Sequence, residues 1–246
     1  MLRREALDHY ARSRASDKAL WTRLGGKPDV RGKVVLDIGC GWGGLCIDLA
    51  ESGAKKVIGV DLTANRIEFC RENLITHYSH LESVIEFHCC ALAELELEDD
   101  VDLVVSKDTF EHVQDLRQLL LDICRVLKHN GMLMSGFGPL YYSYYGDHKA
   151  TGALLPWFHL LIPEHILINR INKKRGLSLT CIKDLGLNQL KLKEYLELFE
   201  QTPLELVFLK TNGSERLASK VFRLLAKIPF LTELFTQSIY IKMRKS

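Results

Sequence analysis

The stretch VVLDIGCGWGGL, Val34 to Leu45, decides how the rest of this chain is interpreted. It begins as a short apolar, β-branched run and continues into a segment with four glycines among six residues. A short apolar run bounded by glycines is typical of a buried strand, and glycines allow a tight turn whose backbone approaches a ligand closely. The stretch therefore predicts a strand, a ligand-binding turn and the start of a helix.

The composition is that of an ordinary globular protein. The chain has 246 residues, 47% of them hydrophobic, and its 33 basic and 31 acidic side chains give a net charge of +2. This length suffices for one α/β domain with a sizeable core and a small additional cap. The balanced charge gives no reason to expect nucleic acid as a partner.

The cysteines and the hydropathy pattern indicate where in the cell the protein is located. Seven cysteines, no C-x-x-C pair and a charged beginning without a signal-peptide pattern favour free thiols in a reducing cytoplasm. No run of 18 apolar residues occurs, so we expect no membrane span.

Strands and helices alternate along the first half of the chain, which predicts βαβ units and a doubly wound, mostly parallel sheet. A helix over residues 5–24 precedes this alternation. The predicted strands are 34–38, 56–60, 83–89, 102–106 and 131–137, and the predicted helices between them are 45–51, 65–77 and 116–127.

After Pro139 this rhythm breaks, and the apolar segment that follows is predicted to be an inserted helical cap. Later segments predict a strand at 204–210, a helix at 217–228 and a strand at 238–243. The expected organisation is an N-terminal helical segment (1–30), an α/β core that binds a cofactor (31–140), a helical cap (141–182) and a C-terminal completion of the sheet (183–246).

The glycine loop predicts a nucleoside-containing cofactor. Gly39, Gly41 and Gly44 satisfy G-x-G-x-x-G, and Asp61 ends the second strand 20 residues after Gly41. An acid at that strand end accepts hydrogen bonds from ribose hydroxyls. These features alone fit a nicotinamide dinucleotide as well as other nucleosides.

Asp37 favours a cationic cofactor. A dinucleotide places its pyrophosphate at the helix N-terminus, and a carboxylate two residues before the first glycine would repel it. S-adenosylmethionine carries an ammonium and a sulfonium instead, and an acid at the strand end complements both. The alternative is that Asp37 only caps the following turn.

The segments VVLDIGCGWGG and VIGVDLT resemble the first glycine motif and the second-strand acid of class I S-adenosylmethionine-dependent methyltransferases. VDLVVSKDTFEHV and ICRVLKHNGMLMSGF are similar to the fourth- and fifth-strand segments of the small-molecule branch of that family. The likeness covers residues 30–140. It implies a seven-stranded Rossmann-like sheet with an antiparallel final strand, and S-adenosylhomocysteine as the product.

The resemblance also implies a set of cofactor-binding residues. They would surround the methionine part, the ribose, the adenine and the methyl end of the cofactor, in that order: Asp37, Gly39, Cys40, Gly41, Trp42 and Gly43; Asp61; Leu62, Ala91 and Leu92; Ser106, Lys107 and Asp108. Many relatives have an acid near position 91 that binds the adenine amino group. This chain has CCALAEL there, so backbone groups or Glu94 would have to substitute.

Two histidines are the candidate catalytic residues. Methyl transfer requires an aligned acceptor and, for a weak nucleophile, removal of its proton. His112 follows the fourth strand and His148 the fifth, at the cofactor end of a parallel sheet, and histidine titrates near neutrality. A purely structural role for His112 is the alternative.

The cap predicts the kind of acceptor. The tyrosines of YYSYYGDH and the apolar LLPWFHLLIPEHILI suit a small aromatic or hydrophobic molecule, although packing or a homodimer contact explains them equally well. Tyr10 and Trp21 are candidates to cover the cofactor, with core packing preferred for Trp21. The basic residues of 217–228 and the tail KMRKS allow peripheral membrane contact, but a solvated face is preferred.

We therefore predict an S-adenosylmethionine-dependent methyltransferase acting on a small hydrophobic or aromatic acceptor, with O-methylation favoured over N- or C-methylation. No metal site is expected, because the spacing of His77, His80 and His88 with the neighbouring cysteines matches no common zinc site. The alternatives are an NAD(P)-dependent oxidoreductase, a non-catalytic scaffold and a methyltransferase for macromolecules.

Overall fold

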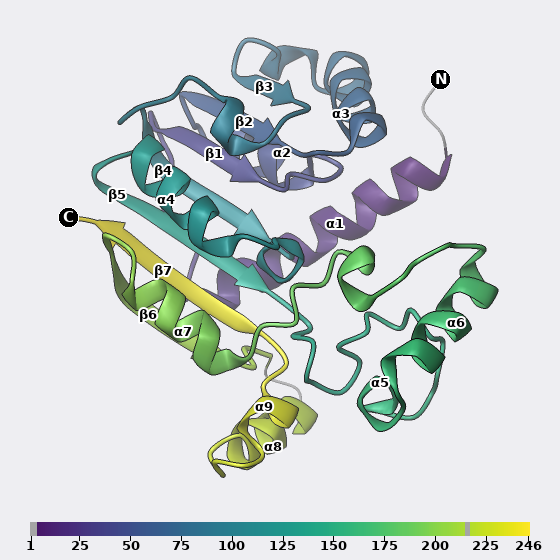
Figure 1. Ribbon diagram of the computed structural model, residues 1–246. Coiled ribbons are helices and arrows are strands. Elements are labelled where there is room, and N and C mark those ends of the chain that lie inside the picture. The colour runs from purple at the N-terminus through teal and green to yellow at the C-terminus, as the bar shows by residue number, and fades with distance from the viewer. Residues whose placement is uncertain (1–3, 215–216) are drawn as a thin grey trace.

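The computed structural model describes residues 4–214 and 217–246, and its centre is a twisted seven-stranded sheet (Figure 1). The strand order is β3-β2-β1-β4-β5-β7-β6. The strands are β1 (Val34–Ile38), β2 (Lys56–Val60), β3 (Ile85–His88), β4 (Val101–Lys107), β5 (Leu127–Phe137), β6 (Leu204–Thr211) and β7 (Ile239–Lys245).

Strands β1 to β5 are parallel, and β7 pairs antiparallel with both β5 and β6. The chain order reverses between β1 and β4, so the carboxyl ends of these two strands flank a crevice. Ligands of open α/β sheets bind at such a point. The predicted doubly wound, seven-stranded fold with an antiparallel last strand is confirmed.

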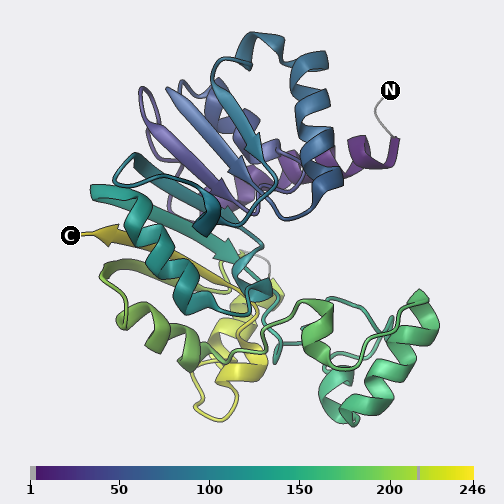
Figure 2. The ribbon, with the colours of Figure 1, turned by 45° about the horizontal axis from the view of Figure 1, so that its top comes forward.

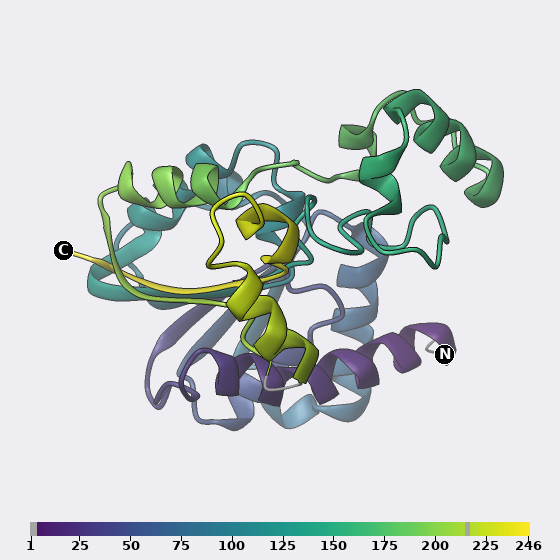
Figure 3. The same cartoon turned by 90° about the horizontal axis from the view of Figure 1, so that it is seen from below.

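Helices cover both faces of the sheet, and apolar side chains fill the two interfaces. Figure 3 shows α1 and α7 on opposite sides of the sheet. One face is covered by α1 (Arg4–Arg23), α2 (Gly44–Glu51) and α3 (Ala64–His77), and the other by α4 (Leu116–Val126) and α7 (Leu192–Glu200). Because β1 and β4 lie between two apolar layers, each strand contains an apolar stretch, Val34–Leu36 in β1 and Leu103–Val105 in β4.

The predicted cap forms a lobe beside the carboxyl ends of the strands (Figure 2). It contains α5 (Phe158–Leu161) and α6 (Glu164–Arg175) and has a small core of its own. That core is made by Ala150, Leu167, Ile168, Ile171, Ile182 and Leu187. The cap is therefore held together by packing that is separate from the two layers on the sheet.

Between β6 and β7 the chain forms α8 (Leu217–Leu225) and α9 (Thr232–Phe235), which face the viewer in Figure 3. Phe222 of α8 packs against Phe235 of α9 and against Tyr144, with ring centroids 5.1 Å apart in both pairs. This aromatic contact connects α8 with the segment that follows β5.

Several predicted boundaries shift by one to three residues, and the start of β5 shifts by four. The segment KHNG was expected to separate α4 from a strand beginning at Gly131, but β5 begins at Leu127, directly after the helix. Leu127 pairs with Val101, and the register then shifts before Leu103 meets Met132. An irregular strand start explains how polar residues are accommodated in β5. Among the described helices, none is both long and apolar enough to cross a bilayer.

Candidate functional site

The glycine loop leaves the end of β1 in a conformation that requires glycine. Gly39 and Gly41 have φ angles of 71° and 55°, which side chains disfavour. The amides of Gly39 and Cys40 donate to the carbonyl of Val60, which binds the loop to the end of β2. A Cβ atom on Gly41 would meet only the carbonyl oxygen of Gly39, 4.0 Å away, so this side of the loop is open to a ligand.

Asp61 links the loop to the start of α3. Its carboxylate accepts hydrogen bonds from the amide of Gly41 at 3.0 Å and the amide of Thr63 at 2.8 Å. Arg66 lies 3.6 Å from the same carboxylate. The side chain is 8% exposed. Asp61 thus presents a carboxylate held in place at the end of β2, where the sequence predicts a ribose-binding acid.

Asp37 lies under the glycine loop and is 1% exposed. Cys46 on α2 donates its thiol to the Asp37 carboxylate at 3.3 Å. Burial raises the pKa of Asp37 well above its usual range, because a charged carboxylate is poorly solvated there. A bound cation would offset this desolvation, so the residue fits a cationic ligand.

A cleft of about 440 Å³ opens over this loop. Its lining residues come from the glycine loop, from the ends of the neighbouring strands and from α1: His9, Arg12, Ser13, Ser16, Asp37, Gly39, Cys40, Gly41, Trp42, Leu45, Arg66, Lys107 and Asp108. Trp42 stacks on His9 with centroids 5.5 Å apart, which joins the loop to the first helix. This cleft is the candidate cofactor site.

The contribution of α1 to the cleft differs from the expected one. Tyr10 is buried and donates to Tyr78 at 2.8 Å, and Trp21 is buried and donates to Asp48 at 3.1 Å. His9, Arg12, Ser13 and Ser16 line the cleft instead. The burial of Trp21 confirms the preferred prediction of core packing, whereas Tyr10 does not line the cleft and the polar face of the helix turns toward it. Helical periodicity could have identified that face.

Lys107 at the end of β4 fastens α1 over the cleft. Its ammonium lies 2.7 Å from Asp17 and also donates to the carbonyl of Ser13 and the hydroxyl of Ser16. Both side chains of the ion pair are largely buried. The positive charge of Lys107 is therefore already paired within the protein.

The other two residues predicted near the methyl end, Asp108 and Ser106, lie in different surroundings. Asp108 lines the cleft, and burial raises its pKa. Ser106 does not face the cleft: it is fully buried and donates to the carbonyl of Ile38 at 2.9 Å. Its side chain points between β4 and β1. Ser106 therefore has a structural role and does not line the cofactor cleft as predicted.

The predicted adenine-binding residues differ in exposure. Leu62 is 75% exposed, Leu92 is buried, and the amide of Ala91 donates to the Glu94 carboxylate at 2.8 Å. Glu94 therefore already has a partner within its own turn. The exposed face of Leu62 remains the candidate contact for a planar base.

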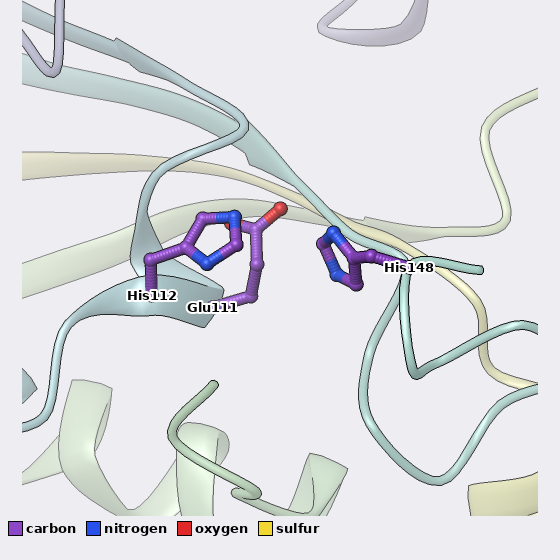
Figure 4. A group of neighbouring side chains, drawn as sticks. All are labelled: Glu111, His112 and His148. Atoms are coloured by element: carbon purple, nitrogen blue, oxygen red, sulfur yellow. The ribbon is translucent and has the colours of Figure 1, made fainter. Parts of the chain in front are cut away.

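A second group of side chains lies at the carboxyl ends of β4 and β5 (Figure 4). Glu111 and His112 belong to a 3₁₀ turn, Phe110–His112, after β4, and His148 follows β5. The rings of His112 and His148 are 5.0 Å apart between centroids. One oxygen or nitrogen of each of the three side chains lies within 4.8 Å of the others.

Backbone groups orient all three side chains. His112 Nδ1 lies 2.9 Å from the carbonyl of Gly186, and His148 Nε2 lies 3.0 Å from the carbonyl of Pro139. A carbonyl only accepts, so each of these nitrogens carries a proton and the other ring nitrogen is free to accept one. The amide of Gly138 donates to Glu111 Oε1 at 2.9 Å, and within the described chain Oε2 has no partner.

The electrostatics of this triad disfavour charge on Glu111 and on His148. Glu111 is 2% exposed, and burial with the nearby charge of Asp108 raises its pKa to about 8. Burial and the adjacent His112 lower the pKa of His148. Near neutral pH Glu111 is therefore mostly protonated, and His148 favours its neutral imidazole, whose free ring nitrogen can accept a proton. The arrangement can therefore take up a proton, and its donor set could also hold a metal ion, which the sequence did not predict.

Glu111 is the functional candidate that the sequence analysis missed. The segment FEHV was considered only for His112, although Glu111 is the adjacent residue. An acid inside an apolar segment after a buried strand was the available signal. Asp147, by contrast, accepts hydrogen bonds from the amide and the hydroxyl of Thr151, and it forms no dyad with His148.

The four tyrosines after β5 are partly buried and pack mainly on other aromatic rings. Tyr141 contacts Tyr142 and His159, and Tyr144 contacts Tyr145 and Trp157. These contacts join the cap and α8 to the sheet. The predicted acceptor-lining role of the tyrosines therefore remains a prediction.

Comparison with known proteins finds sequence similarity in the first half of the chain. Residues 29–137 match the family described as "Methyltransferase domain". A ubiquinone biosynthesis O-methyltransferase from Bradyrhizobium diazoefficiens is 37% identical over 100 residues, which are 41% of this chain and 38% of that protein. Phosphoethanolamine N-methyltransferase 3 from Arabidopsis thaliana is 35% identical over 104 residues, 42% of this chain and 20% of the relative. The chain thus spans less than half the length of these curated relatives.

The fold has close structural counterparts. A crystal structure of an S-adenosylmethionine-dependent methyltransferase from Mesorhizobium loti superposes with a TM-score of 0.62. That superposition covers 94% of this chain and 97% of the other at 17% identity. At this level of identity the likeness supports the fold, including the C-terminal part that the sequence matches leave out.

Proposed function

We propose that the chain transfers the methyl group of S-adenosylmethionine to a small hydrophobic or aromatic acceptor, because its residues 29–137 match the family described as "Methyltransferase domain". The observation that carries this proposal is the buried carboxylate of Asp37 beneath the open glycine loop. An anionic group at this position is matched by a cationic ligand and disfavours a pyrophosphate.

The basic residues of the cleft do not reverse this preference. Lys107 is paired with Asp17, and Arg66 lies beside Asp61. Arg12 donates through Nε to the carbonyl of Asp8. With two of the three cations next to carboxylates, the cleft offers little uncompensated positive charge for a dinucleotide, which is the main alternative ligand.

The residues of the cleft have distinct proposed roles. Asp37 and the loop residues Gly39 to Gly43 border the methionine part of the cofactor, and Asp61 accepts hydrogen bonds from the ribose hydroxyls. Leu62, Ala91 and Leu92 lie on the adenine side, and Lys107 and Asp108 on the methyl side. When bound, S-adenosylmethionine supplies an electrophilic methyl group.

The triad of Glu111, His112 and His148 is the proposed proton acceptor for the methyl acceptor molecule. Asp108 lines the cofactor cleft, and its charge acts on Glu111, so the triad adjoins the methyl end of the cleft. His112 and His148 each keep one free ring nitrogen that can take a proton from a hydroxyl. This arrangement supports O-methylation, although the triad would also serve a nitrogen or carbon acceptor.

The proposal includes the cellular location of the protein and the class of its acceptor. The cysteines of the described chain are free, which suits a reducing compartment, and we place the protein in the cytoplasm. Its acceptor is a small molecule rather than nucleic acid, in keeping with the net charge of +2.

Calorimetric titration tests the cofactor assignment. The protein is titrated with S-adenosylmethionine, S-adenosylhomocysteine, NAD and NADP, alongside Asp37→Asn. Binding of the first two ligands, strongly weakened in the variant, supports the proposal. Exclusive binding of a nicotinamide cofactor would overturn it.

The affinity measured in the same titration should depend on pH. Burial raises the pKa of Asp37 in the free protein, whereas a bound cation favours the carboxylate. Affinity for S-adenosylmethionine should therefore rise with pH, from the usual titration range of an aspartate up to the raised pKa of Asp37. This component of the slope should be absent in Asp37→Asn.

Turnover tests the triad. Phenols, amines and amphipathic acids are incubated with the protein and methyl-labelled cofactor. His112→Ala should lose turnover by about a hundredfold, the usual contribution of a general base, with unchanged cofactor affinity. If His112→Ala retains activity and His148→Ala loses it, the base is His148. If both variants retain full activity, neither histidine acts in the reaction.

A further inference from the structure

Helix α8 exposes an apolar stripe that nothing in the described chain covers. Leu217, Val221 and Leu224 follow one another at helical spacing and are 78%, 44% and 64% exposed. The turn after the helix continues this surface with Ile228 and Phe230, which are 37% and 79% exposed. Single exposed apolar residues are common, but five on one short segment indicate an interaction site.

The charge around the stripe indicates what would cover it. Residues 217–231 contain three basic side chains and no acidic one. Lys220 and Lys227 are exposed. At 100° per residue Lys220 lies about 40° around α8 from Leu224, and Lys227 follows the helix in the turn that carries Ile228 and Phe230. An apolar face bordered by lysines is the pattern of helices that lie in the interface of an anionic bilayer.

The opposite face of α8 is fixed to the protein. Phe222 packs on Tyr144 and Phe235, and Arg223 donates to the carbonyls of Asn212 and Ser214. The helix is therefore held by its inner face, while the side chains of the stripe are exposed. Figure 3 shows α8 in front of the sheet. A helix fixed in this way presents its apolar side chains without having to fold on binding.

The same aromatic cluster reaches the segment that carries His148. Trp157 packs on Phe235 and Phe222, and two exposed leucines, Leu154 and Leu155, precede it in the chain. Their side chains are 91% and 57% exposed. The apolar surface of α8 is thus mechanically connected to the segment between β5 and the cap.

We propose that α8 and the following turn, residues 217–230, dock this protein on an anionic phospholipid surface. The apolar stripe enters the acyl boundary, and Lys220 and Lys227 contact the headgroup phosphates. This inference goes beyond methyl transfer and does not depend on it. It replaces the expectation that the basic face of this helix is only solvated.

Vesicle flotation of the full chain tests this docking. The protein is mixed with vesicles of phosphatidylcholine alone, or with vesicles in which phosphatidylglycerol replaces a third of the lipid. The double variant Val221→Glu/Leu224→Glu removes the stripe, and Ile75→Glu on α3 is the matched control, because Ile75 is 62% exposed on another helix. Binding of S-adenosylhomocysteine and the melting temperature verify that each variant is folded.

The wild type and Ile75→Glu should float with the anionic vesicles, and the double variant should lose at least about tenfold in apparent partitioning. Lys227→Glu should lose about fivefold on anionic vesicles and little on neutral ones, while Lys55→Glu, an exposed lysine elsewhere, stays near the wild type.

Three outcomes would overturn the proposal. Failure of the wild type to float with anionic vesicles is one, and equal flotation of the wild type and the double variant is another. The third is a wild-type dimer in light scattering that becomes monomeric in the double variant without any vesicle binding. That result would assign the stripe to a second copy of the chain.

Discussion

Asp61 combines two roles. It binds the glycine loop by accepting a hydrogen bond from the amide of Gly41, and it is the proposed acceptor of hydrogen bonds from the ribose hydroxyls. Asp61→Ala should weaken S-adenosylmethionine binding by roughly 1–3 kcal/mol, the usual cost of unpaired polar partners. Asp61→Asn retains one acceptor oxygen and should lose less. Calorimetry on both variants measures the difference, and unchanged affinity in Asp61→Ala would mean that the ribose lies elsewhere.

Glu111 makes stability depend on pH. Its pKa is about 8 in the folded protein and near 4.3 in an unfolded chain, so folding favours the protonated form. This contribution is complete below about pH 4.3 and is lost as the pH rises to 8, which lowers the free energy of unfolding by an amount on the order of a few kcal/mol.

Glu111→Gln mimics the protonated residue and should remove that loss. Urea unfolding of the wild type and the variant between pH 5 and pH 9 measures it. The curves should agree at the acidic end and separate toward pH 9, with the variant more stable. Parallel curves across the range would show that Glu111 ionises normally in the folded protein.

At the scale of elements, α1 depends on one ion pair with the sheet. Lys107→Met would leave Asp17 buried without its partner, and we expect a loss of about 3 kcal/mol in the free energy of unfolding. The same change should weaken cofactor binding, because α1 contributes to the cleft. The double variant Lys107→Met/Asp17→Asn removes both charges and should be destabilised less. A double variant no more stable than Lys107→Met would contradict this account.

The elements themselves were largely predictable from sequence, and their polar contacts were not. Strand β2 was predicted residue for residue, because a β-branched run between Gly53 and Asp61 has few other conformations available. The start of β5 was misplaced, because KHNG has the composition of a helix stop but lies in an irregular strand start, between Leu127, which pairs with Val101, and Met132, which pairs with Leu103. Periodicity reports on burial, whereas pairing depends on residues distant in the sequence.

The candidate site was predictable to the same degree. Asp37 and Asp61 follow from the local spacing on β1 and β2, and the structure places both beside the glycine loop. The meeting of Glu111 with His148 joins the ends of β4 and β5, 37 residues apart, and no local pattern encodes it. Ser106 shows the converse error, since it was expected to line the cofactor site from the last position of the predicted fourth strand, whereas its side chain is buried within β4.

At the scale of the whole molecule, the cap has its own core and the cofactor cleft does not include it. Replacing residues 153–180 with a short glycine-serine linker should therefore leave S-adenosylhomocysteine affinity within about threefold, since no cleft contact is removed. Turnover of a hydrophobic acceptor should fall below detection. Loss of cofactor binding in a folded variant would show that the cap supports the cleft.

The place of β7 in the sheet has a consequence for synthesis on the ribosome. β7 lies between β5 and β6, so β6 has no strand beside it until residues 239–245 have left the exit tunnel. The five parallel strands can assemble during translation. Until β7 has emerged, β6 and the helices between β6 and β7 are not paired with the sheet. Nascent chains arrested before residue 239 should therefore be sensitive to proteases beyond β5, and release should abolish this sensitivity.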